Sequence, residues 1–391
     1  MPEFEDFFPT LLVVAALLLA ALAAAPVAAR LGLPAPAAFL AVGIVAGLAG
    51  WGPFDDVGAV ALQQIGALAL YAILFQGGLS TGFRAWRASA RAILLLGLPG
   101  TAVTAAAVAA IAHWVLGLEW ALAAFVGIAL APTDPAAVYA TLRGGAATRA
   151  RTVLEGESGF NDPVGISLMV VAVLLVADPG AGLGDGVARF AQELSIGLAG
   201  GVVGAVALVA LLRATPRLED NLQAVAMLTG AVIVGAATAA LHGSGFLAVY
   251  LAGLLIADRW ARQDDHNHPV TQAAAGIAEP VLFGLLGASF APLVGWTELW
   301  QGIALTLVMI VAVRPPLAWA CLARSGLARA ERLLVSWGGL KGAVPLLLAA
   351  YPALERLDEA GATQATVLVA TAASIVVQGG SLRFIGARAR T

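Results

Sequence analysis

The stretch Glu157-Ser158-Gly159-Phe160-Asn161-Asp162-Pro163 places two acids and an amide inside a long apolar sequence. Val153-Leu154 precedes it and Val164–Val170 follows it, so Asp162 is expected near the centre of a membrane-spanning segment. An ionisable group at that depth costs about 3 kcal/mol on insertion scales, and such groups usually belong to an ion or proton pathway. The stretch therefore predicts an all-α membrane protein that handles ions.

The composition agrees with this prediction. Hydrophobic residues make up 60% of the chain and charged residues 12%, and the apolar runs are about 20 residues long, enough to cross a bilayer as helices. A single cysteine, Cys321, excludes a disulfide framework. The sequence contains no polybasic patch, so nucleic acid is not an expected partner.

Thirteen transmembrane segments are predicted, and the basic residues support that number. Seventeen of the 21 basic residues follow odd-numbered segments, whereas only Arg189 and Arg356 lie in the opposite loops. By the positive-inside rule, we expect the N-terminus outside and the C-terminus in the cytoplasm. The expected location is the inner (plasma) membrane of a bacterium. The predicted segments are approximately 10–29, 36–50, 58–78, 90–117, 119–142, 150–177, 191–213, 221–241, 243–258, 270–291, 297–323, 331–351 and 362–382.

Two of these segments are interrupted near their centres. Ala131-Pro132-Thr133-Asp134-Pro135 interrupts the fifth segment, and Trp337-Gly338-Gly339-Leu340-Lys341-Gly342-Ala343-Val344-Pro345 interrupts the twelfth. Proline removes backbone donors, and the freed carbonyls are tolerated at that depth only inside protein or around a cavity. Residues 90–177 and 297–382 thus form two triplets of opposite orientation, each with a broken middle helix. This pattern predicts an inverted-repeat transporter with its site between two broken, crossing helices.

The side chains expected at the site offer oxygen ligands. Ser158 and Asp162 are four residues apart and share one helix face, and Glu157 and Asn161 form a second such pair. Carbonyls freed by the break in the fifth segment add further oxygens, which hard cations prefer. The sequence has no thiolate or imidazole cluster, so neither a transition metal nor another cofactor is expected.

The charges expected at the site favour a monovalent ion. Asp134, Glu157 and Asp162, set against Arg314 and Lys341, leave a net charge of −1 if all are ionised. One proton or one monovalent cation would neutralise this charge, whereas a divalent cation would overshoot. Because burial disfavours the charged form of a carboxylate, Asp162 is suited to bind a proton as well as a cation. Competition for Asp162, with only the neutral loaded state crossing the membrane, predicts exchange of one cation for one proton.

The motifs resemble those of the NhaP-type monovalent cation:proton antiporters, the family that includes the animal sodium/proton exchangers. Thr133-Asp134-Pro135, Glu157-Ser158-x-x-Asn161-Asp162 and Gly338-Gly339-Leu340-Lys341-Gly342-Ala343 occur in the family's order and spacing, across essentially the whole chain. The resemblance implies thirteen helices, a homodimer, and a core domain of residues 90–177 and 297–382. That core would move against dimerisation and scaffold helices in 1–78 and 221–291, with 191–213 as the linking helix.

The resemblance also implies roles for the residues that meet the ion. Asp162 would be the carboxylate shared by cation and proton, and Asp134, Ser158 and the carbonyl of Thr133 would be further cation ligands. The Asn161-Asp162 pair is typical of electroneutral members, whereas electrogenic relatives carry two aspartates. Na⁺ and K⁺ both remain open as the transported ion.

The other motif residues are implied to hold the site together. Asn161 would link the two broken helices, and Glu157 would pair with Arg314. Lys341 departs from the family pattern, because relatives commonly have arginine there; charge pairing and pH response are its two candidate roles. Gln76 departs too, because relatives often have an acid at its position; it is either a packed polar group or part of a cytoplasmic funnel.

Two other functions remain as alternatives. A non-transporting ion or pH sensor on a transporter scaffold has the same sequence features. An intramembrane protease would use Gly156-Glu157-Ser158-Gly159 or Gly182-Leu183-Gly184-Asp185. The first motif needs a histidine base, but His113 and His242 are expected near the outer ends of their segments, and the second motif lies in a loop.

Two further sets of polar residues have open roles. Glu279 lies about two turns deep in the tenth segment, where it either lines the cytoplasmic funnel or packs in the interior. His266 and His268 lie beside Asp264 and Asp265 in a cytoplasmic loop, which is either a solvated turn or a pH-sensing or metal-binding site.

Overall fold

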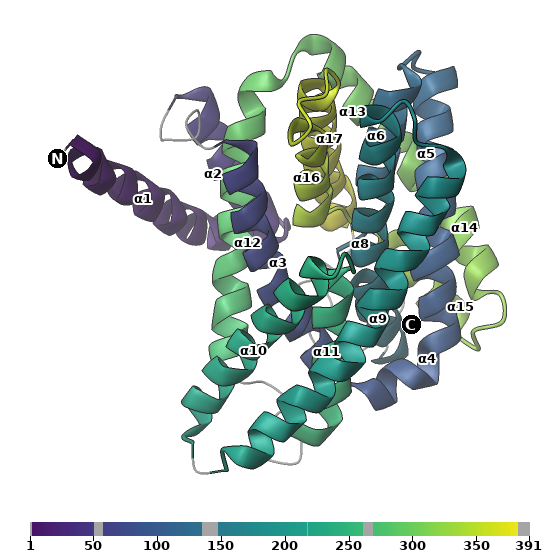
Figure 1. Ribbon diagram of the computed structural model, residues 1–391. Helices are drawn as coiled ribbons and strands as arrows, with labels where there is room; N and C mark the ends of the chain where they lie inside the picture. The colour runs from purple at the N-terminus through teal and green to yellow at the C-terminus, as the bar shows by residue number, and fades with distance from the viewer. Residues whose placement is uncertain (1, 51–57, 135–147, 217, 261–268, 382–391) are drawn as a thin grey trace.

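The structure, a computed structural model, describes residues 2–50, 58–134, 148–216, 218–260 and 269–381 (Figure 1). In these ranges the regular structure is entirely helical. Nine helices there are long and apolar enough to cross a membrane. Four shorter apolar helices accompany them: Ala35–Leu48, Trp120–Ala129, Gly245–Asp258 and Ala343–Ala353. These thirteen helices correspond one to one with the predicted segments, so the all-helical prediction is confirmed.

The helices follow one another in this order. The first half contains α1 (Pro2–Arg30), α2 (Ala35–Leu48), α3 (Ala59–Thr81), α4 (Phe83–Leu95), η2 (Leu96–Gly100), α5 (Thr101–Trp114), α6 (Trp120–Ala129), α8 (Thr148–Ala177) and α9 (Leu183–Ala214). The second half contains α10 (Asp220–Ala240), α11 (Gly245–Trp260), α12 (Pro269–Phe290), η3 (Ala291–Leu293), α13 (Trp296–Val308), η4 (Met309–Val313), α14 (Arg314–Leu322), α15 (Arg329–Trp337), α16 (Ala343–Ala349), η5 (Tyr351–Ala353), α17 (Ala360–Ser374) and η6 (Ile375–Gly379).

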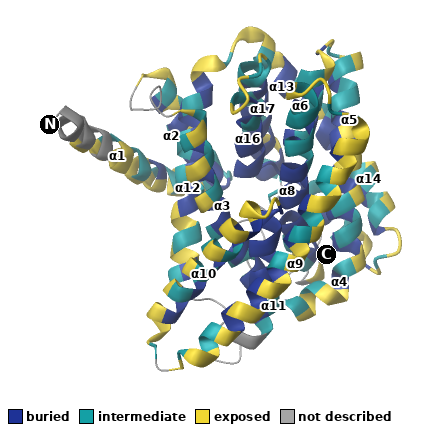
Figure 2. Ribbon diagram, viewed as in Figure 1, coloured by how far each residue is buried: buried dark blue, intermediate teal, exposed yellow. Residues whose placement is uncertain are grey.

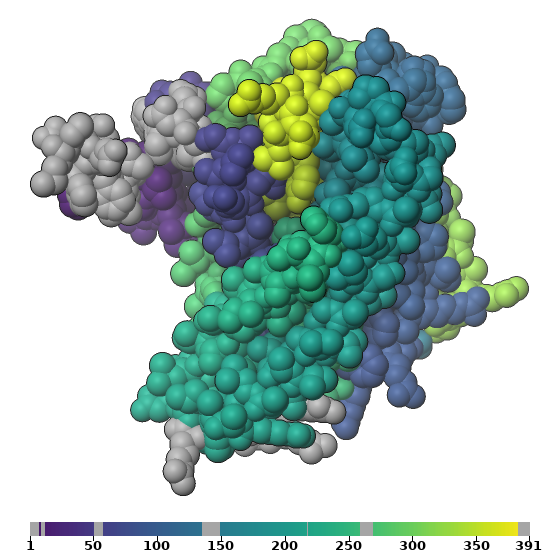
Figure 3. All heavy atoms as spheres, viewed as in Figure 1, coloured from purple at the N-terminus to yellow at the C-terminus, as the bar shows by residue number. Residues whose placement is uncertain are grey.

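Helix α8, which carries Asp162, lies in the interior. Residues 156–167 are all buried, and the helix packs against α4, α6, α9, α15 and α16. Figure 2 shows α8, α11 and α16 largely buried, whereas α1 extends from the body with much of its surface exposed. In the space-filling view, α9 and α10 cover the face towards the reader (Figure 3). The central ionisable residues are therefore enclosed by protein, as intramembrane charges require.

Small residues bring the helices around this centre close together. A Cβ atom at Gly253 of α11 would lie 2.6 Å from the carbonyl oxygen of Phe75 in α3, and Gly78 of α3 faces the backbone of Tyr250. Gly43 of α2 meets Gly284 of α12 in the same way. Helices in lipid associate through such close packing because the hydrophobic effect does not drive them together. The pairs α3–α11 and α2–α12 are therefore tightly packed.

The first helix of each predicted triplet changes pitch at a matching place. Helix α4 passes through the π-helical segment η2 into α5, and α13 passes through the π-helical segment η4 into α14. Proline accompanies both changes, because Pro99 lies inside η2 and Pro315 directly follows Arg314 at the start of α14. Proline breaks the regular hydrogen-bond ladder and so accounts for the local change. The first helices of the two predicted triplets thus share a π-helical segment next to a proline.

Candidate functional site

The two predicted interruptions are present and meet each other. Helix α6 ends at Ala129 and residues 130–134 are not helical, while residues 338–342 separate α15 from α16. The backbone N–H of Asp134 donates to the carbonyl of Leu340 at 2.8 Å. The non-helical segments are therefore joined directly through their backbones. Pro135, the last residue of the first interruption, lies outside the described residues.

Lys341 joins the two interruptions a second time. Its Nζ donates to the carbonyls of Pro132 at 2.9 Å and Ala131 at 3.3 Å. These carbonyls lie just beyond the last helical turn of α6, where helical donors are missing. Lys341 is buried, so its ammonium supplies donors that water cannot supply at that depth.

Two residues that were not predicted at the site, Ser374 and Gln378, hydrogen-bond to the backbone of the second interruption and its flank. Ser374 Oγ accepts a hydrogen bond from the backbone N–H of Lys341 at 3.1 Å and donates to Gln378 Oε1 at 2.7 Å. Gln378 Nε2 donates to the carbonyl of Trp337 at 2.9 Å. Two polar residues four apart in an apolar segment are the sequence signal that would have indicated this pair.

Asp162 lies beside Ser158, as their spacing predicts. Ser158 Oγ donates to Asp162 Oδ2 at 3.3 Å, and both side chains are buried. Asn161, on the adjacent face of α8, donates from Nδ2 to Thr133 Oγ1 at 2.9 Å. Helix α8 is thereby joined to the interruption after α6, next to Asp134.

Glu157 and Arg314 form a buried, two-pronged ion pair. Arg314 Nη2 donates to Glu157 Oε2 at 2.8 Å, and Nη1 donates to the other carboxylate oxygen. The same Nη2 also donates to the carbonyl of Val335 at 3.3 Å. Because Arg314 begins α14 and Val335 lies near the end of α15, the pair connects α8 to both helices. Such a fork-to-carboxylate contact is both strong and geometrically specific.

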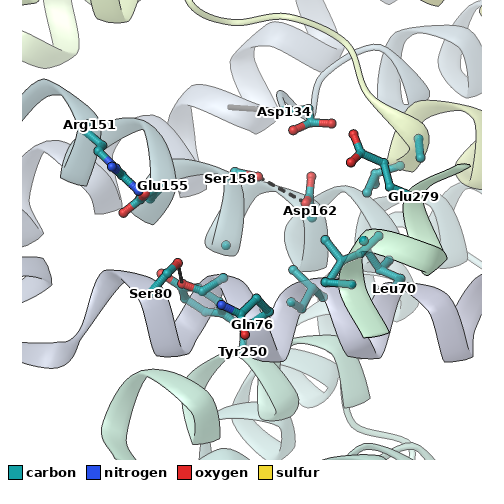
Figure 4. Close-up of a pocket in the computed structure, with 18 residues that line it drawn as sticks. Leu70, Gln76, Ser80, Asp134, Arg151, Glu155, Ser158, Asp162, Tyr250 and Glu279 are labelled. Carbon is teal, nitrogen blue, oxygen red and sulfur yellow. Dashed lines mark hydrogen bonds and ion pairs between the residues drawn. The ribbon is translucent and has the colours of Figure 1, made fainter. Parts of the chain in front are cut away.

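A cavity of about 300 Å³ extends along α8 to Asp162. Its walls come from α8, α16 and Asp134 on one side and from α3, α11 and α12 on the other. Figure 4 shows the carboxylates of Asp134, Asp162 and Glu279 grouped at one end, with the ion pair of Arg151 and Glu155 at the other. The cavity thus brings together carboxylates from three separate parts of the chain.

Glu279 and Gln76 both line this cavity, on the side formed by α3, α11 and α12. Glu279 belongs to α12 and Gln76 to α3, and each has a buried side-chain oxygen without a hydrogen-bond partner in the described part of the chain. Of the two roles considered for each residue, cavity lining is the one that the structure supports. Thr133 is buried but is not among the residues that line the cavity. His266 and His268 lie outside the described residues.

The contacts of His113, Asp185 and Ser158 account for these residues without a catalytic role. His113 Nδ1 lies 2.7 Å from the carbonyl of Leu118, and its ring stacks on Trp120 with centroids 4.0 Å apart. Asp185 accepts a hydrogen bond from the N–H of Gly182 at 2.8 Å and so caps the start of α9. Ser158, the nucleophile that the first motif would need, instead donates to Asp162.

Comparison with known proteins identifies the family. A family model described as the transmembrane sodium/hydrogen exchanger matches residues 15–388. The K(+)/H(+) antiporter NhaP2 of Shewanella sp. (strain ANA-3) is 32% identical over 364 residues, which cover 91% of this chain. The chain belongs to the sodium/hydrogen exchanger family. The resemblance stated from the sequence motifs is thereby confirmed.

Two further proteins are similar to this chain over nearly its whole length. The Na(+)/H(+) antiporter NhaH of Halobacillus dabanensis is 28% identical over 409 residues, covering 98% of each chain. The sodium proton antiporter MjNhaP1 from Methanocaldococcus jannaschii has the same fold, with a TM-score of 0.79 and 19% identity over 98% of this chain and 99% of that one. The chain spans only 63% of the length of the Shewanella relative.

Proposed function

We propose that this protein is a secondary antiporter that exchanges a monovalent cation, Na⁺ or K⁺, for H⁺. The observation that carries the proposal is the cavity that ends at Asp162 and Asp134, beside two interrupted helices that meet in the interior. A titratable carboxylate in that position binds either a cation or a proton, and discontinuous helices supply backbone dipoles to the ion. An enzyme would need a reaction centre, whereas the contacts at this site suit reversible ion binding.

In this mechanism Asp162 is the carboxylate that cation and proton share. Ser158 is one helical turn away and presents a hydroxyl oxygen, and Asp134 lines the same end of the cavity (Figure 4). These oxygens, with the carbonyl of Thr133, form the proposed cation site. Asn161 holds α8 against the first interruption through Thr133. When a proton occupies Asp162, the carboxylate is neutral and no longer attracts the cation, so binding of one excludes the other.

Glu279 changes the charge balance of the proposed site. Asp134, Asp162, Glu157 and Glu279, set against Arg314 and Lys341, leave a net charge of −2 if all are ionised. A bound monovalent cation then leaves one negative charge, which a proton on one of the cavity carboxylates neutralises. When a cavity carboxylate other than Asp162 keeps that proton throughout the cycle, exchange at Asp162 remains one cation for one proton and electroneutral.

The position of the cavity supports movement of a core against a scaffold. Apart from Ser80, its lining residues divide between the proposed core, 90–177 and 297–382, and the proposed scaffold, 1–78 and 221–291. Glu155, near the Arg151 end of the cavity, is seven residues from Asp162, or about 10 Å along the helix. Since Arg151 is expected on the cytoplasmic side, the cavity opens towards the cytoplasm in this conformation. Residues 191–213 would link the two parts.

We extend the proposal to a homodimer formed by scaffold helices in an inner (plasma) membrane. Helix α1 supports this, because it extends from the body (Figure 1) and Leu12 and Leu19 on it are largely exposed. In the membrane such residues contact either lipid or a second copy.

Proton movement in everted vesicles tests the exchange. A pH-sensitive dye reports the internal pH after Na⁺, K⁺ or Li⁺ is added in turn. We expect proton efflux from acidified vesicles on addition of one of the first two cations, which names the ion. The relatives named as K(+)/H(+) and Na(+)/H(+) antiporters make both worth testing.

The alternative function is a non-transporting sensor on the same scaffold. A sensor would bind the cation without moving protons, so binding measured by calorimetry would persist while the dye signal is absent in vesicles that hold folded protein. That combination of results would replace the exchange proposal.

A further inference from the structure

A second cavity, of about 260 Å³, lies between the beginning of α4, the beginning of α8 and the loop from α14 to α15. It shares no lining residue with the cavity around Asp134, Asp162 and Glu279, which we call the carboxylate cavity. We call it the arginine cavity because four arginines line it: Arg87, Arg91, Arg149 and Arg324. Its described lining includes no acidic side chain. Positive charges from three parts of the chain therefore surround one hollow without a counter-charge.

Two neighbouring arginines, Arg84 and Arg151, do have acidic partners. Arg84 lies 4.0 Å from a carboxylate oxygen of Asp258, and Arg151 lies 2.8 Å from Glu155. No ion pair within the described ranges involves any of the four arginines of the arginine cavity. The positive-inside rule accounts for arginines on this side of the membrane, but not for their convergence around a cavity. All four of these arginines are exposed, and the repulsion between like charges around one cavity falls when an anion lies between them.

Hydrogen bonds to backbone carbonyls orient the guanidinium group of Arg149 without neutralising its charge. Arg149 donates from Nη2 to the carbonyl of Ser325 at 3.3 Å and from Nη1 to that of Gly326 at 3.4 Å. These acceptors are neutral, so Arg149 keeps its full charge at the cavity. The buried Ser89 also lines the cavity and adds a hydroxyl. Guanidinium groups with a nearby hydroxyl are the donors that phosphate oxygens accept best.

We infer that the arginine cavity binds a phosphate-bearing anion, either the headgroup of an anionic phospholipid or a free phosphate. These arginines follow the third, fifth and eleventh segments and are therefore expected at the cytoplasmic face. That leaflet carries anionic lipids, and basic pockets between transmembrane helices on this side bind their headgroups. The position of the cavity, its positive charge and the membrane face to which it is assigned are therefore all consistent with a phosphate-bearing anion.

The bound anion joins the two predicted repeats. Helix α4 and the start of α8 belong to residues 90–177 or directly precede them, whereas the loop of Arg324 belongs to 297–382. One anion that contacts both sides stabilises the folded state by mass action, because the unfolded chain does not form the site. Thermal stability therefore reports occupancy without any transport measurement.

The test is thermal unfolding of the whole protein in an uncharged detergent. Three samples contain micelles with phosphatidylglycerol, micelles with phosphatidylcholine, and plain micelles with inorganic phosphate. We expect phosphatidylglycerol to raise the unfolding temperature and phosphatidylcholine to leave it unchanged. An equal rise with inorganic phosphate at the same concentration identifies free phosphate as the ligand; a rise with phosphatidylglycerol alone identifies the lipid.

Substitutions test whether the stabilisation by phosphatidylglycerol comes from the arginine cavity. The double substitution Arg91→Gln, Arg324→Gln should require about tenfold more phosphatidylglycerol for the same rise, since each basic residue contributes substantially to attraction of anionic lipid. The control Arg30→Gln, Arg213→Gln removes the same charge from exposed positions outside the arginine cavity and should respond as wild type. If the double variant does not fold, Arg324→Gln alone, in an exposed loop, is measured against Arg213→Gln.

Two outcomes would overturn the inference. One is that neither anion stabilises the wild-type protein. The other is that the control variant loses the response as fully as the cavity variant, which would indicate general charge attraction. Neither outcome bears on cation exchange, which is measured separately.

Discussion

At the scale of single residues, Asp162 is the first position to test. It is buried in α8, lines the carboxylate cavity and accepts a hydrogen bond from Ser158. Asp162→Asn keeps the shape but removes both the charge and the exchangeable proton. We expect cation-dependent proton movement in vesicles to be abolished while the unfolding temperature is not lowered, because no ion pair of Asp162 is lost. Asp358→Asn, at an exposed position, is the control. Substantial exchange by Asp162→Asn would rule out the single-carboxylate mechanism.

Substitution of Glu279 is expected to weaken exchange without abolishing it. It faces Asp134 and Asp162 across the cavity but belongs to α12, outside the meeting point of the interruptions (Figure 4). Glu279→Gln removes attraction for the entering cation without removing the shared carboxylate. We expect the cation concentration for half-maximal exchange to rise several-fold, with exchange still present. The control is Glu119→Gln, an exposed glutamate at the start of α6. A complete loss of exchange with normal folding would instead make Glu279 a second obligatory carboxylate.

Arg314 is expected to matter for stability. Arg314→Gln leaves Glu157 buried without its partner, and loss of one member of a buried pair costs about 3–5 kcal/mol. The unfolding temperature in detergent should therefore fall markedly. The double substitution Glu157→Gln, Arg314→Gln removes both charges and should recover most of that loss. If the double variant is as unstable as Arg314→Gln alone, the loss comes from packing or from the bond to Val335 and not from an unpaired charge.

The sequence predicts only some of the residues that meet at the cavity. Ser158 and Asp162 follow from their spacing of four on one helix. For Gln76 and Glu279 the sequence leaves two roles open, funnel lining and interior packing, because a transmembrane helix is apolar on most faces and its pattern does not indicate which face turns inward. Their positions depend on how α3 and α12 pack against α2 and α11, which is a tertiary property.

At the scale of elements, proline and glycine predict where the helices are interrupted, but not how the interruptions are joined. Pro132 and the glycines at 338, 339 and 342 predict loss of helix in both segments. The bond from Asp134 to Leu340 and the reach of Lys341 to Pro132 depend on the crossing of two distant segments. The π-helical segments were not predicted either, since proline in a transmembrane helix is equally compatible with a simple kink.

Substitution of Gly342 tests whether the close contact between the two interruptions is needed for exchange. A Cβ atom at Gly342 would overlap the side chain of Asp134, so Gly342→Ala must displace that carboxylate. We expect exchange to fall at least about tenfold, as small misplacements at reacting groups cost that much or more, while the protein remains folded. Gly361→Ala is the matched control, because open space surrounds Gly361 within the described structure. Wild-type exchange by Gly342→Ala would show that the position of Asp134 is not critical.

At the scale of the whole molecule, the number of helices follows from hydropathy and charge, whereas their ends do not. The seventh segment was predicted from residue 191, but α9 begins at Leu183. Polar residues lower the hydropathy of its first turns, yet the helix continues because Asp185 caps it and Arg189 pairs with Glu193 at 2.9 Å. Similarly, α4 begins at Phe83 and not at 90, and the arginines of its first turns are exposed.

The ends of α9 test the predicted orientation of the molecule. The helix has 32 residues and is about 48 Å long, well beyond the roughly 30 Å of a hydrocarbon core, so both ends reach water unless the helix is strongly tilted. Leu183 and Arg213 are both exposed, and the positive-inside rule assigns Leu183 to the outside and Arg213 to the cytoplasm. In a Cys321→Ala background, a membrane-impermeant maleimide should label Leu183→Cys in intact cells and Arg213→Cys only in everted vesicles. Permeabilised cells, in which both should react, control for access. The reverse pattern would invert the orientation, and the carboxylate cavity would then open outward instead of towards the cytoplasm.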